Sequence, residues 1–320
     1  MLIKTFIEKM IYLTKKLKTL IIVIILLSIS FATNAVENRI IYKVNNQIIT
    51  SYDLKKEFRY LALINPRINN LTKDQIFEIS KNSIIREKIK KIEILNHLEK
   101  IIIDENYSNK MIKETYSKVG LKNIDEFSEL LNDMSISLDE FKEKLAIEAL
   151  WNQLVYEKYK SKVKIDLIKL KEEVSSKKIQ KIYNLSEIVF NIEQSKDLSN
   201  KLNLIFNDIS EEGFENAAVI HSISDTRSLG GELGWVNENS ISEKLKTKIN
   251  TLEIGKYTEA ITIPGGFLIL KLNDIKEETI SLNKDDEINK LIKIKTNQQL
   301  NRFSNIYFKK IEKNIKIEKI

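Results

Sequence analysis

The 320-residue chain contains no cysteine and only two histidines, and both facts narrow the chemistry open to it. Without cysteine, disulfide frameworks, thiol nucleophiles and thiolate metal sites are excluded. The histidines, His97 and His221, lie too far apart in the sequence to indicate a metal-binding pair. The chain also lacks a glycine-rich phosphate-binding loop and the serine, histidine and carboxylate arrangement of hydrolases. We therefore predict no metal and no other cofactor.

More than half of the net positive charge of the chain lies in its N-terminal segment. The formal net charge is +7, but the first 35 residues hold five lysines and one glutamate, so +4 lies there and +3 remains elsewhere. Hydrophobic residues make up 42% of the chain, which is enough for two or three packed units. No region gathers basic residues together with aromatic ones, so we expect no nucleic-acid partner.

The N-terminus has the pattern of a secretory signal. A lysine-rich stretch precedes an apolar run from Leu20 to Phe31, and the small residue Ala35 marks the expected cleavage site. The alternative is a retained membrane anchor, but the run has about 12 residues where a comfortable span needs about 20. We expect residues 1–35 to be a cleaved signal peptide, with membrane attachment only if the segment is retained.

Residues 40–50 are expected to form a small hairpin. Two β-rich runs, Ile40–Val44 and Gln47–Thr50, flank Asn45 and Asn46, which tolerate left-handed turn geometry. Ser51 is then expected to cap a helix that begins near Asp53.

Further helices are expected to follow the hairpin. One starts after Thr72, and the spacing of Ser137 and Glu140 is typical of a capping box at the start of another. Apolar residues recur in both segments at three- and four-residue steps. We interpret these stripes as core packing in preference to a polypeptide-binding surface.

Seven of the eight glycines fall between residues 213 and 266. Because glycine adopts the backbone conformations of tight turns, this region is expected to contain turns and strands. A predicted strand, Leu185–Phe190, and a predicted helix, Ser195–Ile209, precede the glycines, and a predicted strand, Phe267–Leu272, follows them. These elements predict a compact α+β unit of about a hundred residues.

The C-terminal residues return to a helical pattern from Leu282 onward and end in alternating Ile315, Ile317 and Ile320. A single helix and a single short strand cannot bury their apolar faces alone. We expect them to pack on the N-terminal helices.

Three segments resemble a known family. Tyr42–Leu54 resembles the opening of the SurA chaperone domain, and Phe214–Val236 with Ile254–Asp274 resembles a parvulin-type (PpiC, rotamase) prolyl isomerase domain, with "GGELGW" at Gly230–Trp235 as its most specific part. The resemblance implies an α+β fold: a helical SurA-N-like chaperone domain, completed by a C-terminal helix, with one inserted parvulin-like domain. The implied parts are a signal at 1–35, a helical domain at 36–175, a parvulin-like domain at 180–277, and a C-terminal helix and strand at 278–320.

The resemblance also marks site positions, and this chain departs from the family at them. Parvulins carry two histidines on neighbouring strands and a cysteine or aspartate near a loop; Glu187, Leu268 and Ser224 stand at these places, with Asp225 beside Ser224. We favour a Glu187 side chain turned to solvent at the strand edge, the alternative being a buried carboxyl with a raised pKa. His221 is interpreted as structural.

The family's proline-contacting positions correspond to Leu233, Ile241 and Leu245, and Phe267 is a further candidate for the same apolar pocket. All four also fit an ordinary core.

The resemblance implies a periplasmic folding factor that binds unfolded outer-membrane or secreted polypeptides. Its isomerase activity is expected to be weak or absent, because both family histidines are replaced. The alternative is an active prolyl isomerase without histidines, possibly membrane-anchored.

Overall fold

The structure, a computed structural model, describes residues 38–176, 179–192, 197–279 and 284–320. The expected signal peptide lies outside these residues, as do the first residues of the predicted helix at Ser195–Ile209, which runs from Leu198 to Glu212. Within the described ranges, no helix is both long enough and apolar enough to cross a membrane. Residues Ile40–Ile320 form one compact unit with an α+β fold, in which two groups of elements are named below.

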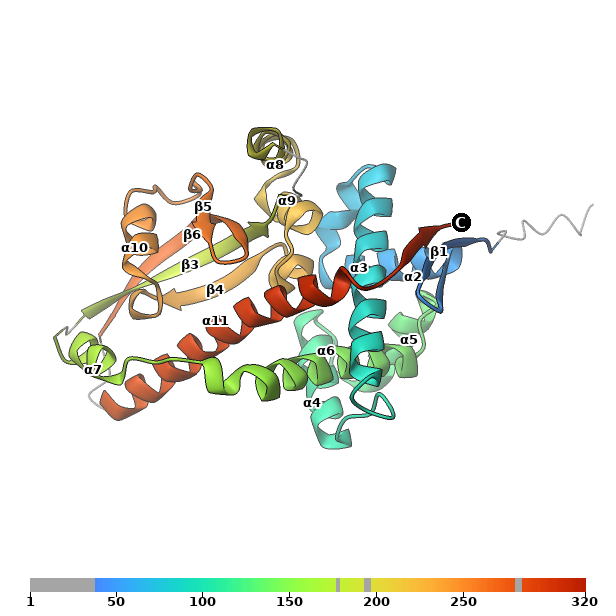
Figure 1. Cartoon of the computed structure of the whole chain (residues 1–320), viewed down its shortest axis with the longest axis horizontal. Coiled ribbons are helices and arrows are strands. Elements are labelled where there is room, and N and C mark those ends of the chain that lie inside the picture. Colours follow the sequence, from blue (N-terminus) through green and yellow to red (C-terminus); the bar gives the residue numbers. More distant parts are fainter. Residues whose placement is uncertain (1–37, 177–178, 193–196, 280–283) are drawn as a thin grey trace, which may run out of the picture. The chain divides into compact units, whose positions relative to one another are not determined.

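The first group, here called the helical module, combines the N-terminal elements with the last two elements of the chain (Figure 1). Its elements are β1 (Ile40–Val44), β2 (Gln47–Thr50), α2 (Ser51–Ile64), η1 (Pro66–Asn70), α3 (Lys73–Leu95), α4 (Glu105–Lys118), α5 (Ile124–Asp133), α6 (Leu138–Tyr159), η2 (Lys160–Lys162), α11 (Lys284–Glu312) and β7 (Ile317–Lys319). Its sheet has the order β2-β1-β7, with both pairs antiparallel.

The starts of these helices follow the local sequence closely. Ser137 caps α6 through a capping box, as expected, and Thr72, after which a helix was expected, caps α3 in the same way. The cap of α2 is Thr50 and not Ser51, because the Thr50 hydroxyl accepts the backbone N–H of Asp53 while the Asp53 carboxylate accepts the N–H of Thr50. The expected cap was therefore wrong by one residue.

The C-terminal helix α11 supplies part of the core of the helical module. Figure 1 shows α11 running beside α6 and crossing α3. The fully buried Trp151 of α6 stacks on Tyr307 with ring centroids 5.5 Å apart, meets Phe308 edge-on at 6.1 Å, and donates its indole N–H to Ser304 over 2.8 Å. All three partners belong to α11. The apolar face of α11 is thus buried on the N-terminal helices.

The second group, here called the sheet module, is built on an antiparallel sheet of order β4-β3-β6-β5. Its elements are β3 (Ile179–Phe190), α8 (Leu198–Glu212), α9 (Phe214–His221), η3 (Asp225–Leu229), β4 (Glu232–Asn237), η4 (Glu238–Ser240), α10 (Glu243–Ile249), β5 (Ile261–Ile263) and β6 (Gly266–Thr279). Strands β3 and β6 extend beyond the predicted ranges. The additional residues of the two strands pair with each other, and the last pair joins Ile179 of β3 to Thr279 of β6. The connecting helix α7 (Leu167–Ser176) packs on α11.

Both faces of this sheet are buried. Leu185, Val189 and Leu268 face one apolar cluster, which α10 covers, while Ile188 and Ile269 face another beneath α8 and α9. The alternation follows from the two-residue period of a strand. The sequence positions at which the predicted domains begin and end stay a prediction.

Replacing Trp151 tests how much the return of α11 stabilises the chain. A Trp151→Ala variant should lower the free energy of unfolding by about 3–5 kcal/mol, because it opens a cavity between α6 and α11 and leaves Ser304 unpaired. Urea unfolding followed by circular dichroism measures the loss. The matched control is Tyr156→Ala on the same helix, whose residue is 46% exposed and should change stability by less than about 0.5 kcal/mol. Equal losses in the two variants would contradict this account.

Candidate functional site

The candidate site centres on Glu187, which lies on the central strand β3 between β4 and β6. One carboxylate oxygen accepts the hydroxyl of Ser224 at 2.5 Å and that of Thr226 at 3.0 Å. The expectation that Glu187 turns to solvent at a strand edge was therefore wrong. β3 is paired on both sides, so Glu187 does not lie on an edge strand.

Gly231 allows the chain to close tightly around Glu187. The backbone N–H of Glu187 donates to the Gly231 carbonyl at 2.8 Å, and a Cβ built on Gly231 would lie 2.1 Å from the Glu187 carbonyl oxygen. The φ of Gly231 is +79°, a conformation that side chains disfavour. A glycine is required here for the turn that leads into β4.

Burial raises the pKa of the Glu187 carboxyl above its usual range. The hydrogen bonds from Ser224 and Thr226 oppose this shift, and the negative charge of Asp225 adds to it. Glu187 is half-buried and its pKa is raised, which is closer to the alternative of a buried carboxyl than to a side chain turned to solvent. The resemblance had grouped Ser224 with Glu187, but no local pattern indicated Thr226, and the two hydroxyl partners lie 37 and 39 positions away.

Leu268 is an apolar core residue on the neighbouring strand. It pairs with Val189 across β3 and β6, is only 6% exposed, and joins the same cluster as Leu185. Glu187 and Leu268, the two positions that the resemblance relates to the parvulin histidines, thus lie on adjacent strands, and neither offers an imidazole.

The four expected pocket residues do not lie together. Ile241 and Leu245 pack in the cluster that contains Leu268, while Leu233 on β4 is 38% exposed. Phe267 lies on the opposite face, stacked on Phe190 at 5.5 Å, because neighbouring residues of a strand point to opposite sides. The expectation of one pocket that includes Phe267 therefore does not match the observed faces.

Asp225 is occupied by ion pairs with the helical module. Its carboxylate lies 3.1 Å from Arg86 and 3.6 Å from Lys90, both on α3, and the Lys90 side chain is 2% exposed. Burial by itself would raise the pKa of Asp225, but the Lys90 and Arg86 cations outweigh it and lower that pKa. Sequence reasoning missed these pairs, because the partners stand well over a hundred residues apart.

His221 engages both of its ring nitrogens within the sheet module. Its Nε2–H donates to Asp208 at 2.6 Å, and its Nδ1 accepts from Lys201 at 3.1 Å. Burial and the Lys201 charge lower the pKa of His221 to about 4, partly opposed by Asp208. A neutral ring held on both sides agrees with the predicted structural role. No group of three or more metal-binding side chains lies together among the residues that the structure describes.

A comparison with family models matches residues 167–274 to the rotamase family, described as a PPIC-type PPIASE domain. Among curated proteins, the chain is 24% identical to chaperone SurA of Hydrogenovibrio crunogenus over 298 residues, covering 88% of this chain and 65% of that protein. It is 36% identical to chaperone SurA of Pseudomonas aeruginosa over 61 residues, or 19% of this chain and 15% of that protein. The chain thus spans less than two thirds of the length of these relatives.

Among solved structures, the chain is similar to one described with PEB4 and Cj1289, two SurA-like chaperones of Campylobacter jejuni. The identity is 16%, the match covers 88% of this chain and 99% of that chain, and the TM-score is 0.35. PrsA from Bacillus subtilis is 18% identical, with 87% of this chain and 93% of that chain covered and a TM-score of 0.30.

The raised pKa of Glu187 predicts a pH-dependent contribution to stability. The folded protein holds the Glu187 proton more tightly than the unfolded chain, so this contribution is complete below the unfolded pKa and is lost as pH rises through the folded pKa. A Glu187→Gln variant keeps an acceptor for Ser224 and Thr226 but carries no charge. Relative to the parent protein, its free energy of unfolding should therefore rise with pH.

Urea unfolding from about pH 4 to about pH 8 measures the difference. The control is Glu232→Gln on β4, an exposed position one strand away, which should show no such trend. The same rise in both variants would mean that Glu187 is not the group responsible.

Proposed function

We propose that this SurA-like chaperone, whose residues 167–274 form a PpiC-type rotamase domain, is a periplasmic folding factor that binds unfolded outer-membrane or secreted polypeptides. In this proposal the rotamase domain has weak or no isomerase activity. The observation that carries the second part is the polar centre itself, in which Glu187, Ser224 and Thr226 bond to one another.

Prolyl isomerisation requires a site that favours the twisted amide over the planar one, against a barrier of about 18–20 kcal/mol. A catalytic group therefore has to reach the substrate's imide with a free donor or acceptor. Glu187 accepts two internal hydroxyls, and Leu268 carries no polar atom. His221 is held by Asp208 and Lys201. These contacts favour a rotamase domain that binds polypeptide or acts as a spacer over one that catalyses prolyl isomerisation.

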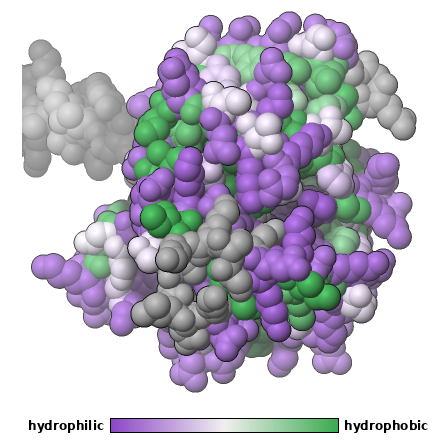
Figure 2. Space-filling view, turned by 90° about the vertical axis from the view of Figure 1, so that its left-hand side faces the viewer, coloured by the Kyte–Doolittle hydropathy of each residue, from purple (hydrophilic) through white to green (hydrophobic). Residues whose placement is uncertain are grey.

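Exposed apolar side chains in the helical module support polypeptide binding. Four of them follow one another where α3 ends and α4 begins: Leu95, Leu98, Ile102 and Tyr107. Large apolar side chains exposed close together are typical of protein interaction sites. By contrast, on the side where α7 and α10 lie, apolar residues form small groups separated by hydrophilic ones (Figure 2). We therefore assign polypeptide binding to the helical module.

The N-terminal lysines, the apolar run and Ala35 support export. N-terminal sequencing of the exported protein distinguishes the two forms: a start at Val36 supports a cleaved signal, and a start at Met1 supports a retained anchor.

Substitutions between α3 and α4 test the binding surface. In a light-scattering assay of an aggregating outer-membrane protein, the double variant Leu98→Ser and Ile102→Ser should suppress aggregation much less than the parent. Each substitution removes an apolar contact of roughly 1.5–3 kcal/mol, so affinity should fall at least about tenfold. The control is Ile168→Ser on α7, where the residue is 74% exposed but lies elsewhere. If the control loses as much activity as the double variant, the surface is wrongly assigned.

A protease-coupled proline isomerisation assay tests the rotamase domain. The full chain should not accelerate isomerisation, and neither Leu233→Ala nor Glu187→Gln should change the rate. Acceleration that disappears in Leu233→Ala would instead support an active isomerase that works without histidines.

A further inference from the structure

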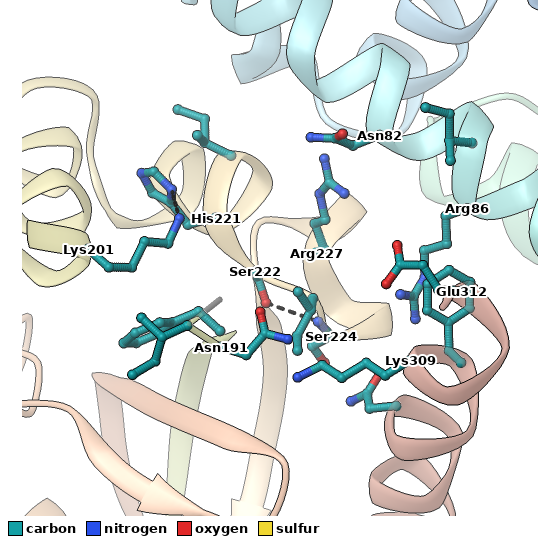
Figure 3. A pocket seen from close by; sticks show the side chains of 17 residues that line it. Asn82, Arg86, Asn191, Lys201, His221, Ser222, Ser224, Arg227, Lys309 and Glu312 are labelled. Atoms are coloured by element: carbon teal, nitrogen blue, oxygen red, sulfur yellow. Dashed lines mark hydrogen bonds between the residues drawn. The ribbon is translucent and has the colours of Figure 1, made fainter. Parts of the chain in front are cut away.

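A cavity of about 430 Å³ opens between the sheet module and helices α3 and α11. Positive charge predominates in its lining, which contains four cationic side chains and one carboxylate, Glu312. The cations are Arg86, Lys201, Arg227 and Lys309. Figure 3 shows Lys201 and His221 on one side of the cavity, Arg86, Lys309 and Glu312 on the other, and Arg227 between them. Pockets that hold small ligands have volumes of about 300–1,000 Å³, so the cavity is large enough for one.

Most of these cations already have partners. Arg86 pairs with Asp225, Lys201 donates to His221, and Lys309 donates to the Gly265 carbonyl at 2.9 Å. Arg227 differs from them. Its Nε donates to the Val219 carbonyl at 2.7 Å, but its Nη2 is buried with no hydrogen-bond partner. A buried charged donor without a partner is costly, which makes it a strong place for an anion to bind.

The pKa shifts of the charged residues around the cavity also favour the binding of an anion. Burial and the neighbouring Arg86 lower the pKa of Arg227 to about 10. Burial also lowers the pKa of Lys309 and raises that of Glu312, so the one lining carboxylate is itself less readily ionised. An added anion would favour the charged forms of Arg227 and Lys309 and the uncharged form of Glu312.

The rest of the lining includes apolar and amide-bearing side chains. Ile85, Ile192 and Phe308 form apolar wall, and the Asn305 side-chain oxygen is buried without a partner. An apolar group beside the anion would contact these walls, and a backbone N–H would pair with the Asn305 amide. A single unpaired guanidinium nitrogen in such a setting suits one negative charge on an organic body better than inorganic phosphate.

We propose that this cavity binds a carboxylate attached to an apolar body, namely the C-terminal residue of a bound polypeptide. The carboxylate pairs with Arg227, the side chain lies against Phe308 and Ile85, and the last backbone N–H donates to Asn305. The identity of the ligand rests on the proposed polypeptide-binding function, whereas the carboxylate preference of the cavity does not.

Isothermal titration calorimetry of the full chain with N-acetylphenylalanine, with its C-terminal amide and with inorganic phosphate tests the cavity. The acid should bind at least about tenfold more tightly than the amide, because the amide oxygen carries no negative charge to pair with the Arg227 cation. Phosphate should not bind measurably. Equal binding of acid and amide, or phosphate binding as tight as the acid, would overturn the proposal.

Variants locate the binding. Arg227→Met should abolish the preference for the acid over the amide. Lys309→Met, which leaves the buried Arg227 contacts intact, should weaken binding of the acid and leave binding of the amide unchanged. The matched control is Lys310→Met, the next residue of α11, which is exposed and does not line the cavity. If Lys310→Met weakens the acid as much as Lys309→Met does, the attraction is general charge and the cavity is not the site.

A last experiment tests the identity of the ligand separately from the proposed polypeptide-binding function. Two otherwise identical peptides from an unfolded outer-membrane protein, one ending in a carboxylate and one in an amide, are titrated into the full chain. Tighter binding of the acid peptide, lost in Arg227→Met, supports the polypeptide terminus as ligand. Equal binding of both peptides overturns that assignment and leaves polypeptide binding intact, whereas no binding of either peptide, together with failure to suppress aggregation, overturns the proposed function as well.

Discussion

The burial of Trp151 between α6 and α11 is the contact on which the arrangement of the chain depends. Its ring stacks on Tyr307 and its N–H bonds to Ser304, so the last helix completes the core that the first helices begin. β7 then pairs with β1 and closes the same module. Because the chain returns to its start, the sheet module is an insertion with both ends held by one core. Arg86 lies over Phe308 at 4.2 Å, which connects this packing to the charged cavity.

The ion pairs of Asp225 give the loop beside the candidate site its fixed place. Arg86 and Lys90 hold Asp225 against α3, and the adjacent Ser224 bonds to Glu187. One short segment therefore joins the helical module to the centre of the sheet. The Lys90 side chain is buried in these pairs, so the cost of removing its charge from water offsets much of the attraction, and the pairs contribute less to net stability than to position. Arg227 of the same segment lines the cavity, so the contacts that position the candidate site also position one wall of the cavity.

The centre of the rotamase domain is a polar group in which Ser224 and Thr226 both donate to one oxygen of Glu187. Leu268 packs in the apolar core, and on the neighbouring strand burial raises the pKa of the Glu187 carboxyl. Polar groups that satisfy one another inside a protein rigidify it and leave little to offer a substrate. The charged cavity has the opposite character, because Arg227 keeps an unpaired nitrogen there. The features that suit binding thus lie beside the rotamase centre and not within it.

Local sequence alone determined the hairpin at residues 40–50, the capping boxes at Thr72 and Ser137, and the glycine-rich turns of the sheet module, because each depends on residues a few positions apart. The α+β class was also predictable, from motifs that lie within single segments. Only the tertiary structure decided that Glu187 points inward to Ser224, that Phe267 lies on the far face, and that Arg86 meets Asp225. Those outcomes depend on strand order and on groups brought together across long stretches of chain, which no local pattern encodes.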